Sequence, residues 1–370
     1  MVEYMRHYAP KSRAVLSLGP FNAILSPKDS ETAFRALITL DTPVQLMALR
    51  LVAKAFLWRW LYLDVSGCYL LTTGHTGLEN RFYAWALRLL GTRVIAIIHD
   101  LIPIEYPEYC RPREFARHSG RVRTALKASA AIVTNSQDTL RELQNYCQQN
   151  VLALPRTLAA PLAPSLPAIR PGARPIIEPY FVVLSTIEPR KNHWILLHVW
   201  RKIVKYLGSS APKLLVIGTR GWESENVVDL LERCRILRGK VMEVASCVDA
   251  DLITYLHHAR ALLFPSFTEG YGLPTTEALS LGLPVIASDL PVFREIVGDV
   301  PDYADPIDGK RWEYLIMDYA RPDSPLRAAQ LERMAAFRQP TWSEHFALID
   351  KLLDELGYQD HLERRPRPTN

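Results

Sequence analysis

Cysteine is scarce in this chain of 370 residues, and it is not arranged for metal or disulfide chemistry. The five cysteines are scattered and odd in number, and none belongs to a C-x-x-C pair. They are Cys68, Cys110, Cys147, Cys234 and Cys247. Structural zinc sites and secreted disulfide frameworks both need regularly spaced cysteines. We therefore expect reduced thiols and a cytoplasmic setting.

Long apolar runs are missing as well. No stretch of about 20 residues is apolar and free of charge, so the sequence predicts no membrane-spanning helix, and the N-terminal residues lack the apolar core of a signal peptide. The most apolar segment, Leu46–Leu63, carries Arg50, Lys54 and Arg59. Because Arg59 lies roughly opposite the other two on a helix, the segment fits a domain helix better than an interfacial helix on acidic lipid. Peripheral contact with the inner face of the plasma membrane stays open.

Motifs of several enzyme classes are absent too. The sequence contains no P-loop, no G-x-S-x-G nucleophile elbow and no H-E-x-x-H metal motif. A dinucleotide-binding G-x-G-x-x-G is also missing, since Gly270 and Gly272 are followed by Leu-Pro-Thr. The net charge of +5 suits phosphate-bearing substrates. The basic residues form no stripe with interleaved aromatics, so we expect no nucleic-acid partner.

What the chain does have is a regular alternation of strand and helix patterns. In the first half the predicted strands are Ala14–Leu18, Cys68–Thr72, Arg93–His99, Ala130–Thr134 and Val151–Leu154, and the predicted helices are Asn80–Leu90, Glu114–Lys127 and Gln137–Cys147. In the second half the predicted strands are Phe181–Leu184, Leu214–Ile217, Val241–Val244, Ala261–Phe264 and Pro284–Ala287. Such alternation predicts βαβ units and mostly parallel sheets.

The length and one proline-rich segment predict two domains. A single core rarely grows past about 250–300 residues, and seven prolines interrupt the chain between Pro155 and Pro179. Proline removes backbone donors, so we interpret this segment as an interdomain linker. The predicted fold is α/β, with Rossmann-like domains over residues 1–165 and 175–340. A C-terminal helix (Ser343–Leu356) and a basic tail complete residues 341–370. Ligands of such sheets bind where parallel strands end, so the site is expected in the cleft between the domains.

The most informative segment after a strand is FPSFTEGYGLPTTEALSLGLPVIAS, residues 264–288. Its glycines let backbone approach a ligand closely, and Pro274 suits the first position of a helix whose N-terminus can bind an anion. Glu269 lies in the loop, and Glu277 follows eight residues later in the helix. The alternative is that Glu277 only favours the helix start and that the glycines only shape a turn.

This string resembles the donor-site signature of the family-4 retaining glycosyltransferases, in which the two glutamates form an E-x7-E motif. The resemblance implies a GT-B fold, with two Rossmann-like domains whose parallel sheets face a cleft. It implies that Glu269 lies beside the transferred sugar and that Glu277 binds the ribose hydroxyls. The backbone amides near the sugar and the diphosphate would be those of Gly270, Tyr271, Gly272 and Leu273.

A second segment, VLSTIEPRKNH, also leads from a strand to a helix. Arg190 and Lys191 would neutralise a diphosphate, whose charge grows as the sugar–phosphate bond breaks. The pair matches the second basic element of the family pattern. The earlier basic residue is missing, because Ser185 and Thr186 stand in its place. The alternative is a solvated basic helix start.

A third segment, AIIHDLIPIEYPE, places His99 and Asp100 at the end of a first-domain strand. The family often has a histidine there, facing the sugar, so His99 joins Glu269 as a candidate catalytic residue. The motif H-D-L-I-P resembles sequences of the bacterial branch of this family that includes many mannosyltransferases. The alternative is a histidine satisfied at a strand end, with Asp100 capping a turn.

Three further sequence features give weaker support for a functional role. Asp249-Ala250-Asp251 spells D-x-D, a metal motif elsewhere, but it precedes a helical pattern and is better interpreted as an N-cap. Gly218 and Gly221 follow a strand and fit either a nucleobase contact or a plain turn. His75 follows a first-domain strand and is a weak candidate for facing the acceptor.

Together these features predict a retaining hexosyltransferase in bacterial surface-polysaccharide or lipopolysaccharide synthesis. Its partners would be a nucleoside-diphosphate sugar, with GDP-mannose as the leading donor, and a glycan or lipid-linked acceptor. Neither metal nor other cofactor is expected, because Arg190, Lys191 and helix N–H groups would stabilise the leaving group. The alternative is a non-catalytic GT-B protein that binds a nucleotide or partner. A phosphorylase-like enzyme would need a pyridoxal-phosphate lysine in a longer chain.

Overall fold

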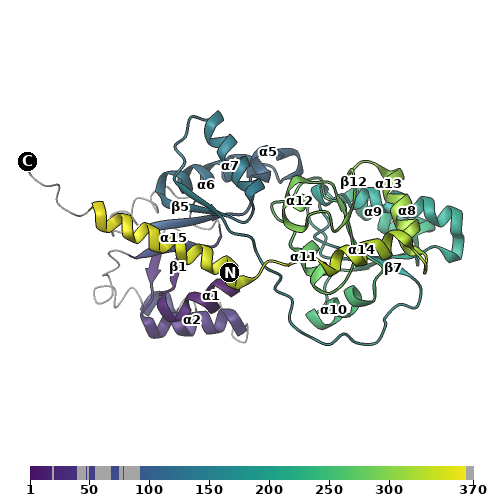
Figure 1. Cartoon of the computed structure of the whole chain (residues 1–370), viewed down its shortest axis with the longest axis horizontal. Coiled ribbons are helices and arrows are strands. Elements are labelled where there is room, and N and C mark those ends of the chain that lie inside the picture. Colours follow the sequence, from purple (N-terminus) through teal and green to yellow (C-terminus); the bar gives the residue numbers. More distant parts are fainter. Residues whose placement is uncertain are drawn as a thin grey trace, which may run out of the picture.

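The computed structural model describes residues 1–18, 21–39, 47, 50–54, 68–74, 78 and 92–363. These residues form two lobes, each built on a parallel sheet, and the chain passes between the lobes twice (Figure 1). The predictions for Asn80–Leu90, His75 and most of Leu46–Leu63 lie outside the described residues. Among the helices that are described, none is long and apolar enough to cross a membrane.

The sheet of the first lobe has four parallel strands in the order β3-β4-β5-β6. Their bounds are β3 Tyr69–Thr72, β4 Arg93–Ile98, β5 Ser129–Thr134 and β6 Arg156–Ala159. Alternate residues of β4 point to opposite faces: Ala96 and Ile98 join one apolar cluster, and Ile95 and Ile97 join another. Both faces are therefore buried, which is why β4 is a continuous apolar run.

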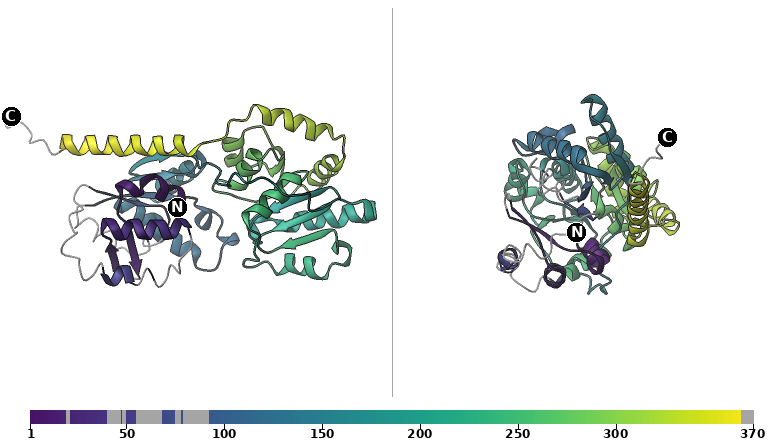
Figure 2. Two further views of the ribbon diagram at one scale, coloured as in Figure 1. Left: turned by 90° about the horizontal axis from the view of Figure 1, so that it is seen from below. Right: turned by 90° about the vertical axis from the view of Figure 1, so that its left-hand side faces the viewer.

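Helices from distant parts of the chain cover the two faces of this sheet. One face is covered by α6 (Glu114–Ala128) and α7 (Gln137–Gln149). The other is covered by α1 (Val2–Tyr8) and by the C-terminal helix α15 (Trp342–Glu363). Figure 2 shows α15 lying along the first lobe after the chain has left the second.

The N-terminal segment differs from a simple βαβ pattern. β1 (Val15–Leu18) falls within the predicted strand, but it pairs antiparallel with β2 (Phe21–Ile24) in a separate two-stranded sheet. The helix α2 (Pro27–Thr39) follows. Two strands so close in sequence can only turn back on each other, since a parallel pair needs a crossover of a dozen or more residues.

The prediction of a strand over Val151–Leu154 is wrong. Val151 has a φ of 53°, and the Leu152 N–H donates to the Cys147 carbonyl at 2.9 Å, so this segment closes the end of α7. The strand at this place is β6, which starts just after Pro155 and therefore inside the segment that we interpreted as linker. β6 itself contains no proline: Pro155 precedes it and Pro161 follows it, so its four residues can pair with β5.

The second lobe has six parallel strands in the order β12-β11-β10-β7-β8-β9. Their bounds are β7 Tyr180–Leu184, β8 Lys213–Ile217, β9 Val241–Val244, β10 Leu262–Phe264, β11 Val285–Ser288 and β12 Asp302–Ala304. Counted from β7 within this lobe, the order is 3-2-1-4-5-6, the doubly wound arrangement. The strand order reverses between β7 and β10. The short edge strand β12 was not predicted.

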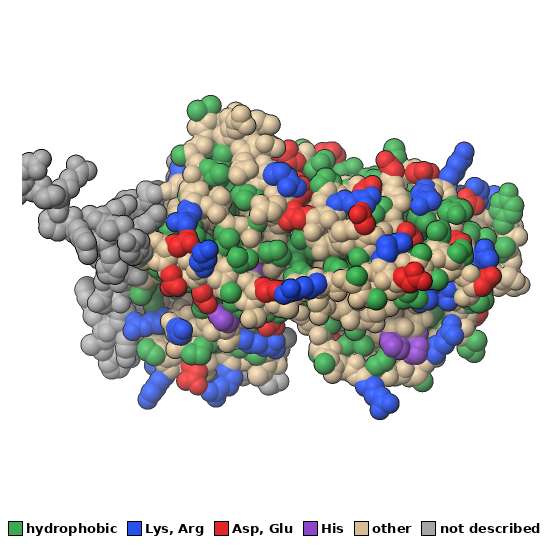
Figure 3. Space-filling view, in the orientation of Figure 1, with side chains coloured by type: hydrophobic (Ala, Val, Ile, Leu, Met, Phe, Trp, Pro, Cys, Tyr) green, Lys and Arg blue, Asp and Glu red, His purple; other side chains and the backbone are tan. Residues whose placement is uncertain are grey.

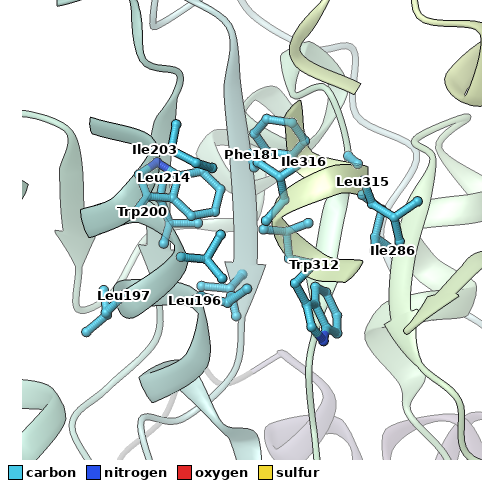
Figure 4. Packing of buried hydrophobic residues seen from close by; sticks show 14 of the residues in the cluster. Phe181, Leu196, Leu197, Trp200, Ile203, Leu214, Ile286, Trp312, Leu315 and Ile316 are labelled. Carbon is cyan, nitrogen blue, oxygen red and sulfur yellow. The ribbon is translucent and has the colours of Figure 1, made fainter. Parts of the chain in front are cut away.

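Helices again pack on both faces of the second sheet. Their bounds are α8 His193–Leu207, α9 Glu225–Arg233, α10 Asp249–His258, α11 Leu273–Ser280, α12 Pro291–Val297, α13 Gly309–Ala320 and α14 Pro325–Ala335. Figure 4 shows one core, in which Trp200 of α8 and Trp312 of α13 lie on either side of Phe181. Each buried indole N–H donates to a backbone carbonyl, Pro212 for Trp200 and Asp305 for Trp312, at 3.0 Å. The cores therefore hold β7, and the loop that follows it, in place.

The linker between β6 and β7 runs along the second lobe, past α10 (Figure 1). The Gly172 N–H donates to Thr254 Oγ1 at 2.9 Å, and His258 Nε2 lies 3.0 Å from the Gly172 carbonyl oxygen. Leu162 and Leu166 pack against the apolar cluster on that face. The linker is thus docked along its length, although the domain boundaries given above stay a prediction.

Candidate active site

The reversal of strand order fixes where the second lobe can hold a ligand. β7 leads into residues 185–191 and β10 leads into residues 265–272, and these two strands are neighbours in the sheet. In doubly wound sheets, the connections that follow two such strands depart to opposite faces, and ligands bind in the crevice at the carboxyl ends of the strands. Both motif segments predicted from the sequence meet at this crevice.

A cluster of four charged side chains lies at the carboxyl ends of these strands. Glu269 Oε2 lies 2.9 Å from Arg190 Nη1, and Glu269 Oε1 contacts Lys191 Nζ. Ser266 Oγ donates to Glu269 Oε1 at 2.7 Å, and Glu188 Oε1 lies 2.7 Å from Arg190 Nε. The side chains of Glu188, Glu269 and Lys191 are only 3%, 7% and 11% exposed. Two cations and two carboxylates thus balance each other in a nearly dry site.

The charges of the cluster stabilise one another. Burial alone would raise the pKa of Glu269, but Lys191 and Arg190 outweigh it and hold the pKa below the ordinary glutamate value. Burial raises the pKa of Glu188, and the two cations oppose that rise. Glu269 is therefore ionised at neutral pH, and a bound diphosphate would compete with it for Arg190 and Lys191.

The two loops that carry these charges are joined by the side chain of Asn192 and by one backbone hydrogen bond. Asn192 has a φ of 53°, a left-handed conformation that asparagine tolerates. Its Nδ2 donates to the carbonyls of Pro265 and Pro306 at 3.1 and 2.7 Å. The Phe267 N–H donates to the Arg190 carbonyl at 2.8 Å. Sequence reasoning did not single out Asn192, Glu188 or Ser266; the polar residues flanking Arg190 and Glu269 were the available signal.

Ser185 and Thr186 stand where the family pattern has its first basic residue. Ser185 Oγ lies 3.3 Å from Nε2 of the buried His193. Burial and the nearby Lys191 lower the pKa of His193 to about 4, so this imidazole is neutral. At Gly218 (φ 148°), an added Cβ would lie 2.1 Å from the Ser185 carbonyl oxygen, so this loop is packed against backbone. Close packing accounts for Gly218 and, in the same way, for Gly221.

The glycines of the donor loop allow two close approaches. Gly272 has a φ of 82° at the start of α11, and an added Cβ would lie 2.4 Å from Phe293 Cε1. At Gly270, an added Cβ would lie 2.4 Å from the His99 carbonyl oxygen of the first lobe. The predicted helix start is confirmed one residue early: α11 begins at Leu273, so Pro274 is its second residue and not its first. That this helix start faces an anion stays a prediction.

Glu277 lies in α11, apart from the charged cluster. Glu277 is 9% exposed, and Leu162 and Leu166 of the linker pack against the apolar cluster that includes its neighbour Ala278. Burial raises the pKa of Glu277 to about 7, and Asp249 adds to the rise. The structure thus brings Arg190, Lys191 and Glu269 together and places Glu277 against the linker.

His99 directly follows β4, and its backbone carbonyl faces the donor loop at Gly270. Its Nε2 lies 3.0 Å from the Thr73 carbonyl oxygen. Ser136 Oγ and Thr139 Oγ1 of the first lobe donate to the Gly270 carbonyl at 3.2 and 3.3 Å. The Asp100 carboxylate caps a turn by accepting from the Ile102 N–H at 3.1 Å. The lobes therefore meet directly at the E-x7-E loop.

Further contacts join the lobes on either side of that loop. Glu295 of α12 accepts from the N–H groups of Gln137 and Asp138, at 2.6 and 2.8 Å, and so caps α7 of the other lobe. The rings of Tyr109 and Phe267 stack at 5.3 Å. The space-filling view shows the lobes in contact, with a notch between them at the lower edge and charges of both signs mixed over the visible face (Figure 3).

The weak D-x-D signal needs a correction. The N-cap of α10 is Val248, with no side-chain cap, so neither aspartate occupies the predicted N-cap position. Asp249 and Asp251 lie in the first turn, where a negative charge favours the helix dipole. Within the described ranges, no three His, Cys, Asp or Glu side chains are grouped to hold a metal ion.

Comparisons with known proteins agree with this geometry. Residues 171–301 match the family described as glycosyl transferases group 1. The chain is 29% identical over 299 residues to O-antigen chain mannosyltransferase B of Escherichia coli, a match that covers 74% of this chain and 77% of that protein. It is 28% identical over 229 residues to the serotype-specific mannosyltransferase WbdA of Escherichia coli, covering 57% of this chain but only 28% of that longer protein.

Solved structures show the same fold. Sucrose-phosphate synthase from Thermosynechococcus elongatus matches with a TM-score of 0.62 at 18% identity, covering 95% of this chain and 87% of that one. Anabaena Alr3699/HepE, solved with UDP and glucose, matches with a TM-score of 0.64 at 16% identity, covering 87% and 89%. At these identities the likeness establishes the fold, which is GT-B.

Proposed function

We propose that this chain, whose residues 171–301 match the glycosyl transferases group 1 family, moves a hexose, with retention, from a nucleoside-diphosphate sugar held by Arg190, Lys191 and Glu277. The observation that carries the proposal is the buried cluster of Arg190, Lys191 and Glu269 at the reversal of strand order. Diphosphates bind at this place in doubly wound sheets, and paired basic side chains provide the charge-assisted hydrogen bonds they need.

The charge balance of the cluster supports a role in stabilising the leaving group. When the acceptor hydroxyl oxygen forms its bond to the anomeric carbon, the bond from that carbon to the phosphate oxygen breaks. The hydroxyl proton passes to the departing diphosphate, whose negative charge grows as it leaves. Arg190 and Lys191 would hold this charge in a site largely closed to water, where preorganised cations are most effective.

Attack from the face of the departing phosphate fits the environment of Glu269. Both of its carboxylate oxygens are engaged, one by Lys191 and Ser266 and the other by Arg190. A carboxylate held in this way orients the sugar more readily than it attacks the anomeric carbon. Such a front-face route retains the anomeric configuration without a covalent sugar–enzyme intermediate.

The donor and the pathway are finer proposals. We propose GDP-mannose as the donor and a glycan or lipid-linked acceptor of bacterial surface-polysaccharide synthesis, at the cytoplasmic face of the inner membrane. The mannosyltransferase names of the two Escherichia coli relatives support this choice. The HepE structure, solved with UDP and glucose, makes UDP sugars the competing donors to test.

The test is a donor screen with purified protein. Nucleotide release from GDP-mannose, UDP-glucose and UDP-galactose is measured with mannose oligosaccharides or bacterial lipid extracts as acceptors. Proton NMR of the product reports the anomeric configuration. Lys191→Ala should abolish turnover, whereas Lys202→Ala, which removes a surface ion pair to Glu313, should not. Turnover of UDP sugars alone would overturn the mannose proposal, and an inverted product would overturn retention.

A further inference from the structure

The loop after β7 and the start of α8 are joined by a pair of polar side chains. Ser185 directly follows β7, and its backbone N–H donates to the Ile217 carbonyl of β8 at 3.1 Å, which fixes it at the carboxyl end of the sheet. Ser185 Oγ lies 3.3 Å from Nε2 of His193, the first residue of α8. His193 is only 2% exposed, whereas Ser185 is half-buried. The pair therefore connects a buried imidazole to a hydroxyl at the end of a strand that borders the crevice.

The surroundings of the imidazole determine which of its nitrogens carries the proton. His193 Nδ1 is buried and has no hydrogen-bond partner among the described residues. A proton on Nδ1 would be an unpaired buried donor on the first residue of a helix, where free N–H groups already carry partial positive charge. The neutral imidazole is therefore protonated on Nε2 and donates to Ser185 Oγ. The Ser185 hydroxyl then keeps its own proton for another acceptor.

The start of α8 favours an anion as that acceptor. α8 is 15 residues long, and its N-cap residue, Asn192, does not cap it through its side chain. Asn192 Nδ2 instead donates to the carbonyls of Pro265 and Pro306. The start of such a helix attracts phosphate groups through its N–H groups and its dipole. Lys191, one of the two cations of the crevice, lies two positions before His193.

We propose that Ser185 is a further donor-binding residue, whose hydroxyl donates to a phosphate oxygen of the nucleoside diphosphate while His193 holds that hydroxyl in place. This role rests on the proposed function, because it takes the crevice as the diphosphate site. His193 is a positioning residue, since it acts through Ser185. Where the family pattern has its first basic residue, this chain thus supplies a hydrogen bond without a charge.

An uncharged donor suits the charge balance of the crevice. The two crevice cations, Arg190 and Lys191, are already paired with carboxylates, so a diphosphate must compete for both of them. The Ser185 hydroxyl is held by a neutral imidazole instead, so it can donate to the diphosphate without displacing a carboxylate. A hydrogen bond to a charged acceptor is stronger than one between neutral groups, so this single hydroxyl should contribute measurably to affinity.

Calorimetric titration with GDP, or with UDP if the wild type prefers it, tests the role of Ser185. Ser185→Ala should bind the nucleotide about tenfold more weakly than wild type, as loss of a hydrogen bond to a charged group requires. Thr186→Val removes the neighbouring hydroxyl, keeps the branched shape of the side chain, and should change the affinity by less than about twofold. Binding of guanosine or uridine, followed by ligand-observed NMR, should also change by less than about twofold in both variants, because a nucleoside has no phosphate.

A double-mutant cycle tests whether His193 acts through Ser185. His193→Leu removes the imidazole donor and should weaken nucleotide binding about fivefold when Ser185 is present, but less than about twofold when it is already alanine. His193→Gln keeps an N–H donor at the position of Nε2 and should retain the affinity to within about threefold. A purely structural role of His193 would instead weaken binding equally in both backgrounds.

The outcomes separate this role from the proposed function. Unchanged nucleotide binding in Ser185→Ala, a larger loss in Thr186→Val, or an equal loss of nucleoside binding would overturn the role of Ser185. Equal effects of His193→Leu in the two backgrounds would overturn the positioning role. A folded wild type that binds no nucleotide would instead remove the proposed function itself.

Unfolding temperatures without ligand verify that each variant folds. If His193→Leu does not fold, His193→Asn takes its place in the cycle, because its shorter side chain withdraws the donor from Ser185 and stays polar. Equal losses of nucleotide affinity from His193→Asn in the two backgrounds would then overturn the positioning role.

Discussion

Replacing Glu269 by glutamine tests the charge balance of the crevice. The change keeps the side-chain volume and removes the negative charge, which leaves Lys191 facing Arg190 with 11% of its own side chain exposed. Removing one partner of a buried ion pair costs about 3–5 kcal/mol. Arg190 keeps Glu188 as a partner, so we expect the lower end, about 3 kcal/mol. For a domain of 150–250 residues this corresponds to a fall in Tm of roughly 6–12 °C.

Nucleotide should restore much of that loss. In wild type the diphosphate must displace Glu269 from the two cations, whereas in Glu269→Gln they are free to bind it. We expect GDP, or whichever nucleotide the protein binds, to bind about tenfold more tightly to the variant, a gain of about 1.4 kcal/mol. Saturating nucleotide should therefore raise the variant's Tm more than that of wild type. Sugar transfer should nevertheless fall about 100-fold, the usual scale for losing one positioned polar group.

Differential scanning calorimetry at pH 7.5, with and without nucleotide, measures both effects. The ordinary pKa of Glu269 is 4.5, and its folded value is lower. Its stabilisation is therefore complete above about pH 4.5 and is lost as the pH falls through the folded pKa. Glu313→Gln is the matched control, because it breaks an exposed pair with Lys202 and should shift stability by less than about 1 kcal/mol. An unchanged Tm, or nucleotide binding weakened in Glu269→Gln, would refute the reasoning.

Three other predictions address the loop and the lobe contacts. Because burial raises the pKa of Glu277 to about 7, the preference for ribose over dideoxyribose nucleotides should increase from pH 6 to pH 8 in wild type and stay flat in Glu277→Gln, as calorimetry can show. Gly270→Ala places a methyl group 2.4 Å from the His99 carbonyl oxygen, so the rate of sugar transfer should fall at least about tenfold while nucleotide binding persists. Gly120→Ala is its control in the same assays, because an added Cβ there would meet nothing within 4 Å. Glu295→Ala removes the acceptor of the Gln137 and Asp138 N–H groups, while Ser136 still caps α7, and should weaken the lobe contact by about 1 kcal/mol. Hydrogen exchange at Gln137 and Asp138 should rise, and unchanged exchange would contradict this role of Glu295.

The sequence indicated the parts of the crevice that local composition determines. A strand followed by glycines, proline and a helix predicted the donor loop, and a strand followed by Arg190-Lys191 predicted its neighbour. Parallel strands end at one edge of a sheet, so the two loops could be expected to lie close together. The residues assigned to donor binding and catalysis stay predictions until nucleotide binding is measured.

What the sequence did not indicate depends on pairings between distant residues. Glu295 accepts hydrogen bonds from the start of a helix that begins more than 150 positions earlier, and no local sequence pattern predicts such a partner. Leu162 and Leu166 of the linker pack against the cluster that contains Tyr271 and Ala278, and no local sequence pattern indicates that pairing either. β6 was missed because the proline density from Pro155 onward suggested an irregular segment, whereas the four residues of the strand lie between Pro155 and Pro161 and contain no proline.

The central claim is that the crevice around Arg190, Lys191 and Glu277 binds a nucleoside diphosphate. Calorimetric titration of wild type with GDP, UDP and ADP, repeated with Arg190→Ala and Glu277→Ala, tests it most directly. We predict that one nucleotide binds preferentially and that both variants weaken it at least about tenfold, as loss of a hydrogen bond to a charged group requires. A well-folded wild type that binds none of the three would contradict the account and favour a non-catalytic protein that keeps the GT-B fold.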